Sequence, residues 1–203
     1  MKSRNIGISG CARSGKNLFA DISENILNKK YGLTTKTFSL AYYLKRDCEE
    51  FVKNNLGLSV WSEITEEKEV FRPMLIWYGH VKRKMTDGRY WIEMINDDIK
   101  KSSADVNLIT DIRYSVYDRD ELHWIKNELV GKVIHITKYR LFGSIRKDTE
   151  PTDPHEILNN PIMKMSSDVA IEWEHSDIIG VPPTENEELN KIVDNVLVKI
   201  LNE

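Results

Sequence analysis

The chain has 203 residues, of which 40% are hydrophobic and 30% charged, and its net charge is −3. This balance indicates one globular domain over residues 1–203, and it gives no support for a strongly basic nucleic-acid binder or a bilayer-spanning segment. Two cysteines make no disulfide framework, and too few apolar residues follow the basic N-terminus for a secretory leader, so we expect a cytoplasmic protein without a membrane partner.

The first predicted elements are a short apolar strand over 5–9 and a helix over 17–30, joined by a glycine-rich turn. The turn reads Gly10-Cys11-Ala12-Arg13-Ser14-Gly15-Lys16-Asn17. It matches the phosphate-binding pattern G-x-x-x-x-G-K, although Asn stands where Ser or Thr normally follows. Backbone N–H groups, the helix N-terminus and the Lys16 ammonium together suit a polyphosphate. We predict that the ATP phosphates are bound by Gly10, Arg13, Ser14, Gly15, Lys16, Asn17 and Leu18. The alternative is a chance glycine turn between a strand and a helix.

The rest of the chain alternates strands and helices, which is typical of a parallel α/β sheet. We expect further strands over 33–40, 106–110, 132–137 and 169–171, and helices over 41–54, 65–78, 90–101 and 118–130. Gly32 and Gly57 should end helices, and Pro73 should obstruct or kink one. Thr184 and Glu187 form a capping box ahead of a last amphipathic helix.

The segment 138–167 is charged and weakly periodic, and it contains Pro151, Pro154 and Pro161. We expect a long irregular insert that acts as a lid over the site. The predicted fold is therefore a three-layer α/β fold of the P-loop NTPase type. It has a mostly parallel five-stranded sheet flanked by helices, with a lid insertion.

Three residues are the sharpest candidates for chemistry. Lys16 should contact the transferring phosphate oxygens and follow them into the transition state. Asp111 and Arg113 come at the carboxyl end of the strand over 106–110, where open α/β sheets bind ligands. Asn17 and Asp111 are candidate Mg²⁺ ligands, since a nucleoside triphosphate reaction requires the metal. Asp111 fits a strand-end cap equally well.

Several short motifs follow one another in a recognisable order. The loop form Arg13-Ser14-Gly15-Lys16 and the strand-end sequence Asp111-Ile112-Arg113-Tyr114 are the most specific. The other pieces are Phe38-Ser39-Leu40-Ala41 with Leu44-Lys45, the stretch from Arg72 to Gly79 with Arg83, Tyr90-Trp91, Glu121, and the strand 133–136 leading to Arg140. Together they resemble the bacteriophage deoxynucleoside monophosphate kinases, within the P-loop nucleoside monophosphate kinase group.

The resemblance implies transfer of the γ-phosphoryl group of ATP, with Mg²⁺, to the 5′-phosphate of a deoxynucleoside monophosphate (dNMP). It places a monophosphate-binding region at 38–104 and a lid at 138–167. It implies that the monophosphate is bound by Phe38, Lys45, Arg72, Arg83, Trp91, Asp111 and Arg113. It also implies that Arg140 closes over the transferring group, so that Lys16, Arg113 and Arg140 are the catalytic residues. A chain of phage origin would act in the host-cell cytoplasm.

The sequence departs from the family pattern at Asn17-Leu18, where an acid and a Thr are usual, and at Tyr42-Tyr43, where Asp-Pro is usual. Two other interpretations therefore stay open. Dephospho-coenzyme A kinase and other small-metabolite kinases share the same loop, sheet and lid. A nucleotide-binding module without catalysis is suggested by the missing hydroxyl. The expected partners are small nucleotides, and a homodimer is left open. The run Lys82-Arg83-Lys84 is thin support for nucleic acid.

Overall fold

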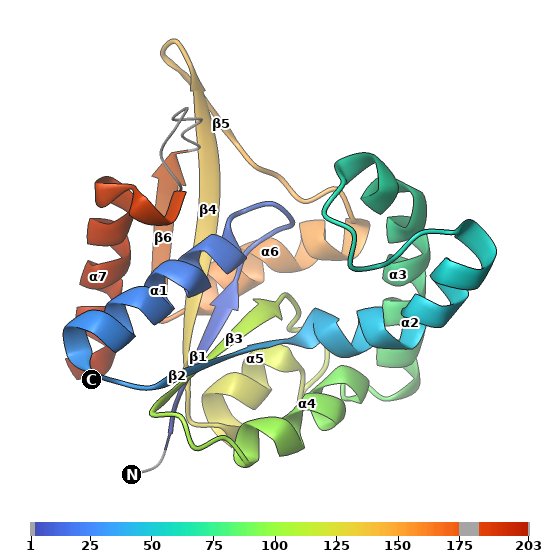
Figure 1. Cartoon of the computed structure of the whole chain (residues 1–203), viewed down its shortest axis with the longest axis horizontal. Helices are drawn as coiled ribbons and strands as arrows, with labels where there is room; N and C mark the ends of the chain where they lie inside the picture. The colour runs from blue at the N-terminus through green and yellow to red at the C-terminus, as the bar shows by residue number, and fades with distance from the viewer. Residues whose placement is uncertain (1–2, 175–182, 203) are drawn as a thin grey trace.

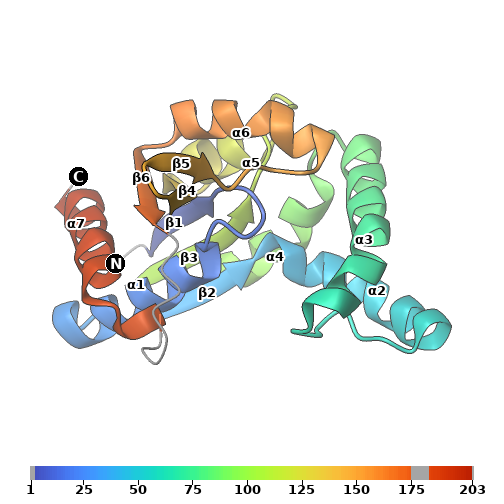
Figure 2. The same cartoon turned by 90° about the horizontal axis from the view of Figure 1, so that it is seen from above.

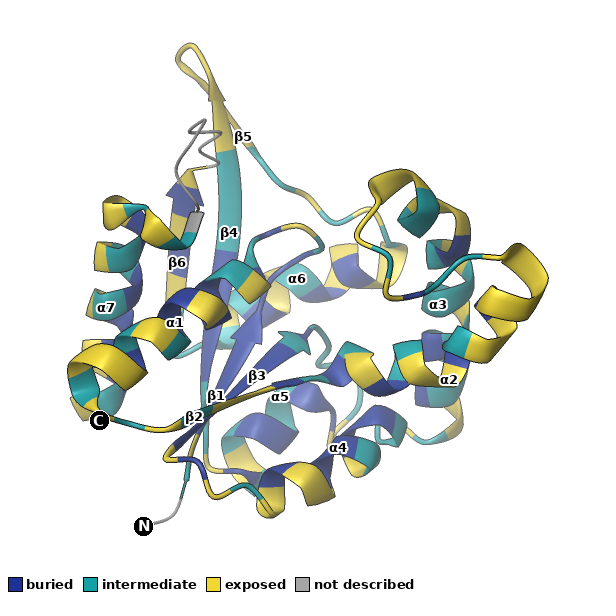
Figure 3. Ribbon diagram, viewed as in Figure 1, coloured by how far each residue is buried: buried dark blue, intermediate teal, exposed yellow. Residues whose placement is uncertain are grey.

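The computed structural model describes residues 3–174 and 183–202 and shows an α/β fold built on one twisted sheet (Figure 1). Five strands are parallel, in the order β2-β3-β1-β4-β6, and β5 pairs antiparallel with the outer part of β4. Their bounds are β1 (Arg4–Ser9), β2 (Thr35–Ser39), β3 (Val106–Ile112), β4 (Lys132–Phe142), β5 (Ile145–Asp148) and β6 (Val169–Glu174). The central strands are buried on both faces, which is why they read as continuous apolar runs (Figure 3).

Helices cover both faces of the sheet, as the view from above shows (Figure 2). On one face α1 (Lys16–Tyr31) and α7 (Glu187–Asn202) form a core with the strands. A second core belongs to α2 (Leu40–Leu56), α4 (Tyr90–Lys100), α5 (Glu121–His123), the π-helical η1 (Trp124–Glu128) and α6 (Pro154–Ser166). The remaining helices are α3 (Thr65–Met85), which packs on α2, and the 3₁₀-helical η2 (Pro183–Glu185). This arrangement confirms the predicted α/β class with a mostly parallel, helix-flanked sheet.

The first two helices end at Gly32 and Gly57, as the sequence predicted. Gly32 and Gly57 adopt left-handed conformations, with φ of 64° and 65°, just after α1 and α2. Each glycine N–H donates to a carbonyl of the last turn, which satisfies a group that the helix itself leaves open. These stops set the lengths of the two helices that flank β2.

Other predicted boundaries were wrong. The helix predicted over 65–78 continues to Met85 as α3, with Pro73 inside it. The helix predicted over 118–130 is only the short α5 followed by η1. The capping box at Thr184 and Glu187 does not form. Instead the Asn186 side-chain oxygen accepts the N–H groups of Glu188 and Leu189, at 3.0 and 3.1 Å.

The segment 138–167 also differs from the prediction, because most of it is regular. Residues 138–142 extend β4, a turn at Gly143 leads into β5, and α6 follows after a short connection. The β4–β5 hairpin projects from the sheet and its end is exposed (Figures 1 and 3). The expectation of a long irregular insert is therefore wrong. Among the described residues, no helix is both long and apolar enough to cross a membrane.

Candidate functional site

The turn between β1 and α1 requires glycine at two positions. Gly10 has a φ of 141°, and a Cβ there would lie 2.5 Å from the carbonyl oxygen of Ile136. Gly15 has a φ of 92°, and its Cβ would lie 2.5 Å from a ring carbon of Trp173. The Trp173 indole N–H also donates to the Ser14 carbonyl at 3.0 Å, so β6 contacts the turn directly. The two glycines of the sequence pattern thus permit a tight backbone that other residues would disrupt.

Lys16 begins α1 and is buried, with only 6% of its side chain exposed. Its ammonium donates to two carbonyl oxygens of its own loop, Gly10 at 3.1 Å and Cys11 at 2.8 Å. The Asp111 carboxylate lies 3.9 Å away. Burial, reinforced by the nearby Arg113 charge, lowers the pKa of Lys16 to about 8. The ammonium is therefore held at the mouth of the loop but is less firmly protonated than a surface lysine.

Asp111 occupies a bulge at the end of β3. Ser9 on β1 pairs with Ile112 rather than with Asp111, and Asp111 has a φ of 65°. This left-handed conformation is uncommon for a residue with a side chain, and bulges of this kind re-aim a side chain near a site. The carboxylate accepts the Ser39 hydroxyl at 2.8 Å. Burial alone would raise its pKa, but Arg113 and Lys16 outweigh that effect and hold the pKa of Asp111 well below its usual range.

Arg113 joins the end of β3 to helix α6. Its guanidinium contacts Asp111 Oδ1 at 3.0 Å and makes a short ion pair with Glu156. Those two carboxylates raise the pKa of Arg113 against the effect of burial, so the group stays charged. The structure therefore brings together three of the predicted residues, Lys16, Asp111 and Arg113, at the carboxyl ends of β1 and β3.

The space between Arg113, Glu156 and the loop holds only a small cavity. A cavity of about 10 Å³, which suits about one water molecule, is lined by Gly10, Cys11, Arg113 and Glu156 among others. The Cys11 thiol donates to the Thr149 carbonyl at 3.0 Å, so the connection from β5 to α6 crosses the loop. A phosphoryl group placed here would have to displace one of these neighbours.

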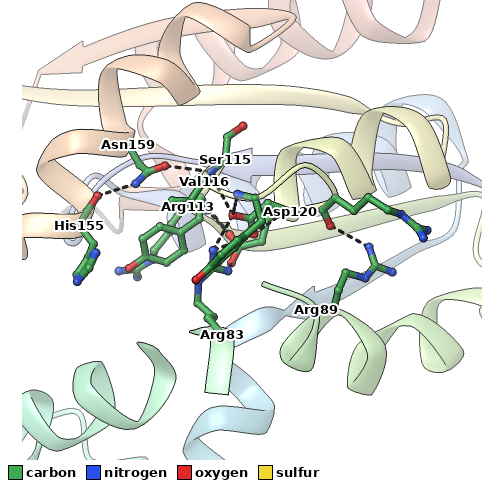
Figure 4. Close-up of polar contacts among 12 residues, drawn as sticks. Arg83, Arg89, Arg113, Ser115, Val116, Asp120, His155 and Asn159 are labelled. Atoms are coloured by element: carbon green, nitrogen blue, oxygen red, sulfur yellow. Dashed lines mark hydrogen bonds and ion pairs between the residues drawn. The ribbon is translucent and has the colours of Figure 1, made fainter. Parts of the chain in front are cut away.

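Arg83 lies in a buried ion cluster rather than at the loop. It forms a two-pronged contact with Asp120 at 2.7 and 2.8 Å and pairs with Glu121 at 2.5 Å (Figure 4). Its side chain is 6% exposed and it packs over the Tyr114 ring. Glu121 also accepts the Arg113 N–H at 2.6 Å. Arg83 thus shapes the segment that carries Arg113, and its guanidinium is already used by two acids.

Arg13 and Arg72 meet at one carboxylate. Arg13 from the loop and Arg72 from α3 contact the same oxygen of Glu69, at 2.6 and 3.1 Å. The Arg13 side chain is 60% exposed and that of Arg72 31% exposed. The two predicted phosphate-binding arginines therefore lie side by side at the edge between the loop and α3.

Phe38, Trp91 and Lys45, predicted for the monophosphate site, and Arg140, predicted as catalytic, have other surroundings. Phe38 and Trp91 are buried in the second core, and the Trp91 indole donates to the Gly79 carbonyl. Lys45 on α2 lies over the exposed ring of Trp61, with its nitrogen 5.4 Å from the ring centre. Arg140 is exposed on the projecting part of β4, opposite Lys147 of β5. It belongs to the β4–β5 hairpin.

The remaining loop residues differ in what they can contribute. Ser14 is buried, and its hydroxyl has no hydrogen-bond partner among the described residues. Asn17 is exposed at the start of α1, while the Leu18 side chain packs against the first core. Leu18 can therefore offer a ligand only its backbone N–H, one of those that the first helical turn leaves open.

The donor set fits a Mg²⁺ ion that arrives with a nucleotide. In the described part of the chain, no three His, Cys, Asp or Glu side chains gather as a metal site. Mg²⁺ commonly takes one or two protein ligands and completes its shell with phosphate oxygens and water. Asp111 beside Lys16 and the exposed Asn17 are protein ligands of that kind.

No family model matches the chain, and no curated protein matches it. Its structure is similar to that of shikimate kinase from Acinetobacter baumannii in complex with shikimate, at 10% identity and a TM-score of 0.47, over 97% of this chain and 94% of that one. It is also similar to dephospho-CoA kinase from Campylobacter jejuni, at 12% identity and a TM-score of 0.46, over 97% and 96% of the two chains. Likeness at this level carries no argument about activity.

Three acids of this region were not predicted as site residues: Glu69, Asp120 and Glu156. Only for Glu156 does the neighbouring sequence contain a feature that could have indicated its position. Asp153-Pro154 marks a helix start, because Asp is a favoured N-cap and Pro a favoured first residue. Such a start would have placed Glu156 in the first turn of a helix instead of in an irregular lid. Its contact with Arg113, 43 residues away, could not be read from the sequence.

Proposed function

We propose that the chain is a phosphotransferase that moves the γ-phosphoryl group of ATP to a deoxynucleoside monophosphate, giving ADP and a deoxynucleoside diphosphate. One observation carries the proposal. A glycine-constrained loop between a buried strand and a helix places a buried lysine 3.9 Å from the acid that ends the neighbouring strand. This is the arrangement that binds and neutralises a polyphosphate chain.

On the donor side, the N–H groups of the loop and of the first turn of α1 bind the ATP phosphates. The Lys16 ammonium exchanges its two carbonyl contacts for oxygens of the β- and γ-phosphates. Asp111 and Asn17 hold the Mg²⁺ ion that accompanies ATP, and the ion supplies further neutralisation of the phosphate charge. Asp111 also holds Lys16 and Arg113 in place, since it contacts both.

On the acceptor side, the nucleophile is an oxygen of a phosphate that is already anionic, so the reaction requires no strong general base. Arg113 supplies a permanent positive charge next to Lys16 and binds the acceptor phosphate. Arg72 and Arg13 supply two more charges at the neighbouring edge. Arg83 acts only indirectly: it holds Glu121, which accepts the backbone N–H of Arg113, and it makes no contact with the acceptor.

The choice of a deoxynucleotide as acceptor rests on the order of motifs described above. Two exposed aromatic rings that lie close to each other are compatible with a nucleotide base as part of the acceptor. Tyr42 and Trp61 are 48% and 41% exposed, and their rings lie 5.5 Å apart. A planar base can stack on such rings at little cost in conformational entropy. Arg140 would contribute only if the β4–β5 hairpin bends toward the loop.

A labelled-ATP transfer assay tests the proposal. Purified protein receives ATP labelled at the γ-phosphate, Mg²⁺, and in separate reactions each dNMP, each NMP, and dephospho-coenzyme A. We expect label to appear on a dNMP. Lys16→Ala should reduce turnover on the order of a thousandfold or more, because one charge clamp on the transferring group is lost. Lys29→Ala, at the exposed end of the same helix, is the matched control and should retain wild-type turnover.

The same assay separates the alternatives. Label on dephospho-coenzyme A alone would identify a small-metabolite kinase with the same loop. ATP binding without transfer to any acceptor would identify a nucleotide-binding module. Equal turnover by the wild type and the Lys16→Ala variant would remove Lys16 from the mechanism.

A further inference from the structure

Glu156 places a carboxylate where the proposed reaction needs an anion. It lies in the first turn of α6, its side chain is 9% exposed, and it pairs with the Arg113 guanidinium. A planar guanidinium binds carboxylates and phosphates in the same geometry. The group that Arg113 now holds therefore has the shape and sign of the group that it would bind in the reaction.

The contact between Glu156 and Arg113 affects the charge that an incoming phosphate meets. Around the loop mouth two cations, Lys16 and Arg113, face two carboxylates, Asp111 and Glu156. The four side-chain charges cancel, so Glu156 offsets the attraction that Arg113 would otherwise exert on an incoming phosphate. The adjoining cavity of about 10 Å³ also leaves no room for a phosphoryl group. A phosphate that binds Arg113 from this cavity therefore has to take the place of one carboxylate.

Glu156 is the carboxylate that can leave. Asp111 is part of β3 and is held by Ser39, Lys16 and Arg113 together. Among the described residues the Glu156 carboxylate pairs with one side chain, that of Arg113, and reaches it from a helix that other contacts keep docked. A change of the Glu156 rotamer is sufficient to free the guanidinium.

Those other contacts hold α6 in place without Glu156. Asn159 accepts the Ser115 N–H at 3.1 Å (Figure 4). Asp153 caps the helix and lies 3.4 Å from the His80 ring nitrogen of α3. The ring of His155 contacts that of His80, with their centres 4.0 Å apart and their planes tilted by 38°. A substitution at Glu156 should therefore leave the fold and the position of α6 unchanged.

We infer that Glu156 is a specificity-determining residue that occupies Arg113 until a phosphate monoester dianion displaces it. A dianion gains more from Arg113 and Lys16 than one carboxylate does, whereas a neutral or singly charged compound does not. The acceptor class that the site admits is thus a phosphate monoester. This inference rests on the proposed function only in assigning Arg113 to the acceptor phosphate.

The test removes the charge and keeps the shape. Glu156→Gln should bind inorganic phosphate about tenfold more tightly than wild type in calorimetry at low ionic strength. It should lower the KM for the dNMP and leave the KM for ATP unchanged. Glu187→Gln, which removes one charge from the exposed first turn of α7, is the matched control and should change neither value.

A second substitution tests whether Arg113 is the source of the extra phosphate affinity. Adding Arg113→Met to Glu156→Gln should abolish the extra phosphate affinity, since the released guanidinium is its source. Glu156→Asp shortens the reach of the carboxylate and should give an intermediate gain; it also serves if Glu156→Gln does not fold. Unchanged or weaker phosphate binding in folded Glu156 variants would overturn the inference.

The two proposals fail separately. Phosphate affinity is measured without ATP, so a gain in Glu156→Gln supports the inference even if no label transfer is found. Conversely, normal transfer with no gain in phosphate affinity overturns the role of Glu156 and leaves the kinase proposal standing.

Discussion

At the scale of single residues, the site is governed by how much charge is buried together. Lys16 is surrounded by two carbonyl oxygens and one carboxylate, and it lies close to Arg113. Burial, reinforced by the Arg113 charge, lowers the pKa of Lys16 to about 8, while Arg113 and Lys16 hold the pKa of Asp111 low against the effect of burial. The two groups remain oppositely charged at neutral pH, which keeps the loop mouth electrostatically ready for a phosphate.

The first prediction concerns pH. In the free protein Lys16 loses its proton above about pH 8, so kcat/KM for ATP should fall about tenfold per pH unit beyond that point. Bound triphosphate favours the ammonium form, so kcat should hold to higher pH. Steady-state kinetics between pH 6 and about 10 measure the alkaline fall of kcat/KM and that of kcat. The arginine of the Lys16→Arg variant stays protonated throughout this range. The variant should therefore show no fall of kcat/KM at alkaline pH, although its rate should be lower than that of the wild type. A wild-type profile that is flat through this range would contradict the placement of Lys16.

The second prediction separates structure from binding at Arg83. Arg83→Met leaves Asp120 and Glu121 buried without their partner, which should lower the free energy of unfolding by about 3–5 kcal/mol. Urea unfolding without any nucleotide measures the loss. Arg72→Met, at a partly exposed position, should cost under about 1 kcal/mol. An Arg83→Met variant of wild-type stability with a raised KM for the dNMP would restore Arg83 as an acceptor ligand.

At the scale of elements, the sequence was informative where the cause is local. The strand–turn–helix around Gly10 and Gly15 follows from positions that only glycine tolerates. The strand that delivers Asp111 and Arg113 follows from an unbroken apolar run. Gly32 and Gly57 end their helices because their N–H groups close the last turn in a left-handed conformation.

The sequence was uninformative where distant contacts decide. The outer part of β4 alternates charged and apolar residues and is ordered by its partner β5 across the Gly143 turn. Asp120 carries no local sign of burial, and Glu121 stands out only through its resemblance to a family motif; both are buried against Arg83, nearly 40 residues away. Glu156 is likewise explained only by its contact with Arg113.

The third prediction tests the start of the last helix. Asn186→Ala removes the side-chain oxygen that accepts two N–H groups of α7 and should cost about 1 kcal/mol of stability. Thr184→Ala should cost much less, because Thr184 lies in η2 ahead of the cap. Urea unfolding of the two variants side by side measures the difference. A larger loss in Thr184→Ala would mean that the capping box predicted from the sequence forms after all.

At the scale of the whole molecule, the sheet gathers residues from four separate stretches of chain at one edge. The loop after β1, the end of β3, helix α3 and helix α6 contribute Lys16, Arg113, Arg72 and Glu156 respectively. Helix α6 is held to the segment after β3 through Asn159 and to α3 through the contact between the His80 and His155 rings. Within the segment 138–167, which the sequence suggested as a lid, α6 contacts the candidate site through Glu156, and the connection before it contacts the loop through Thr149.

Calorimetric titration with a non-hydrolysable ATP analogue and Mg²⁺ tests the central claim, that the β1–α1 loop binds a polyphosphate, most directly. We predict one site per chain in the wild type and in Lys29→Ala, and an affinity at least about a hundredfold weaker in folded Lys16→Ala, because a charge-assisted contact to the phosphates is lost. Equal affinities for the wild type and Lys16→Ala, or no binding to any of the three proteins, would contradict it.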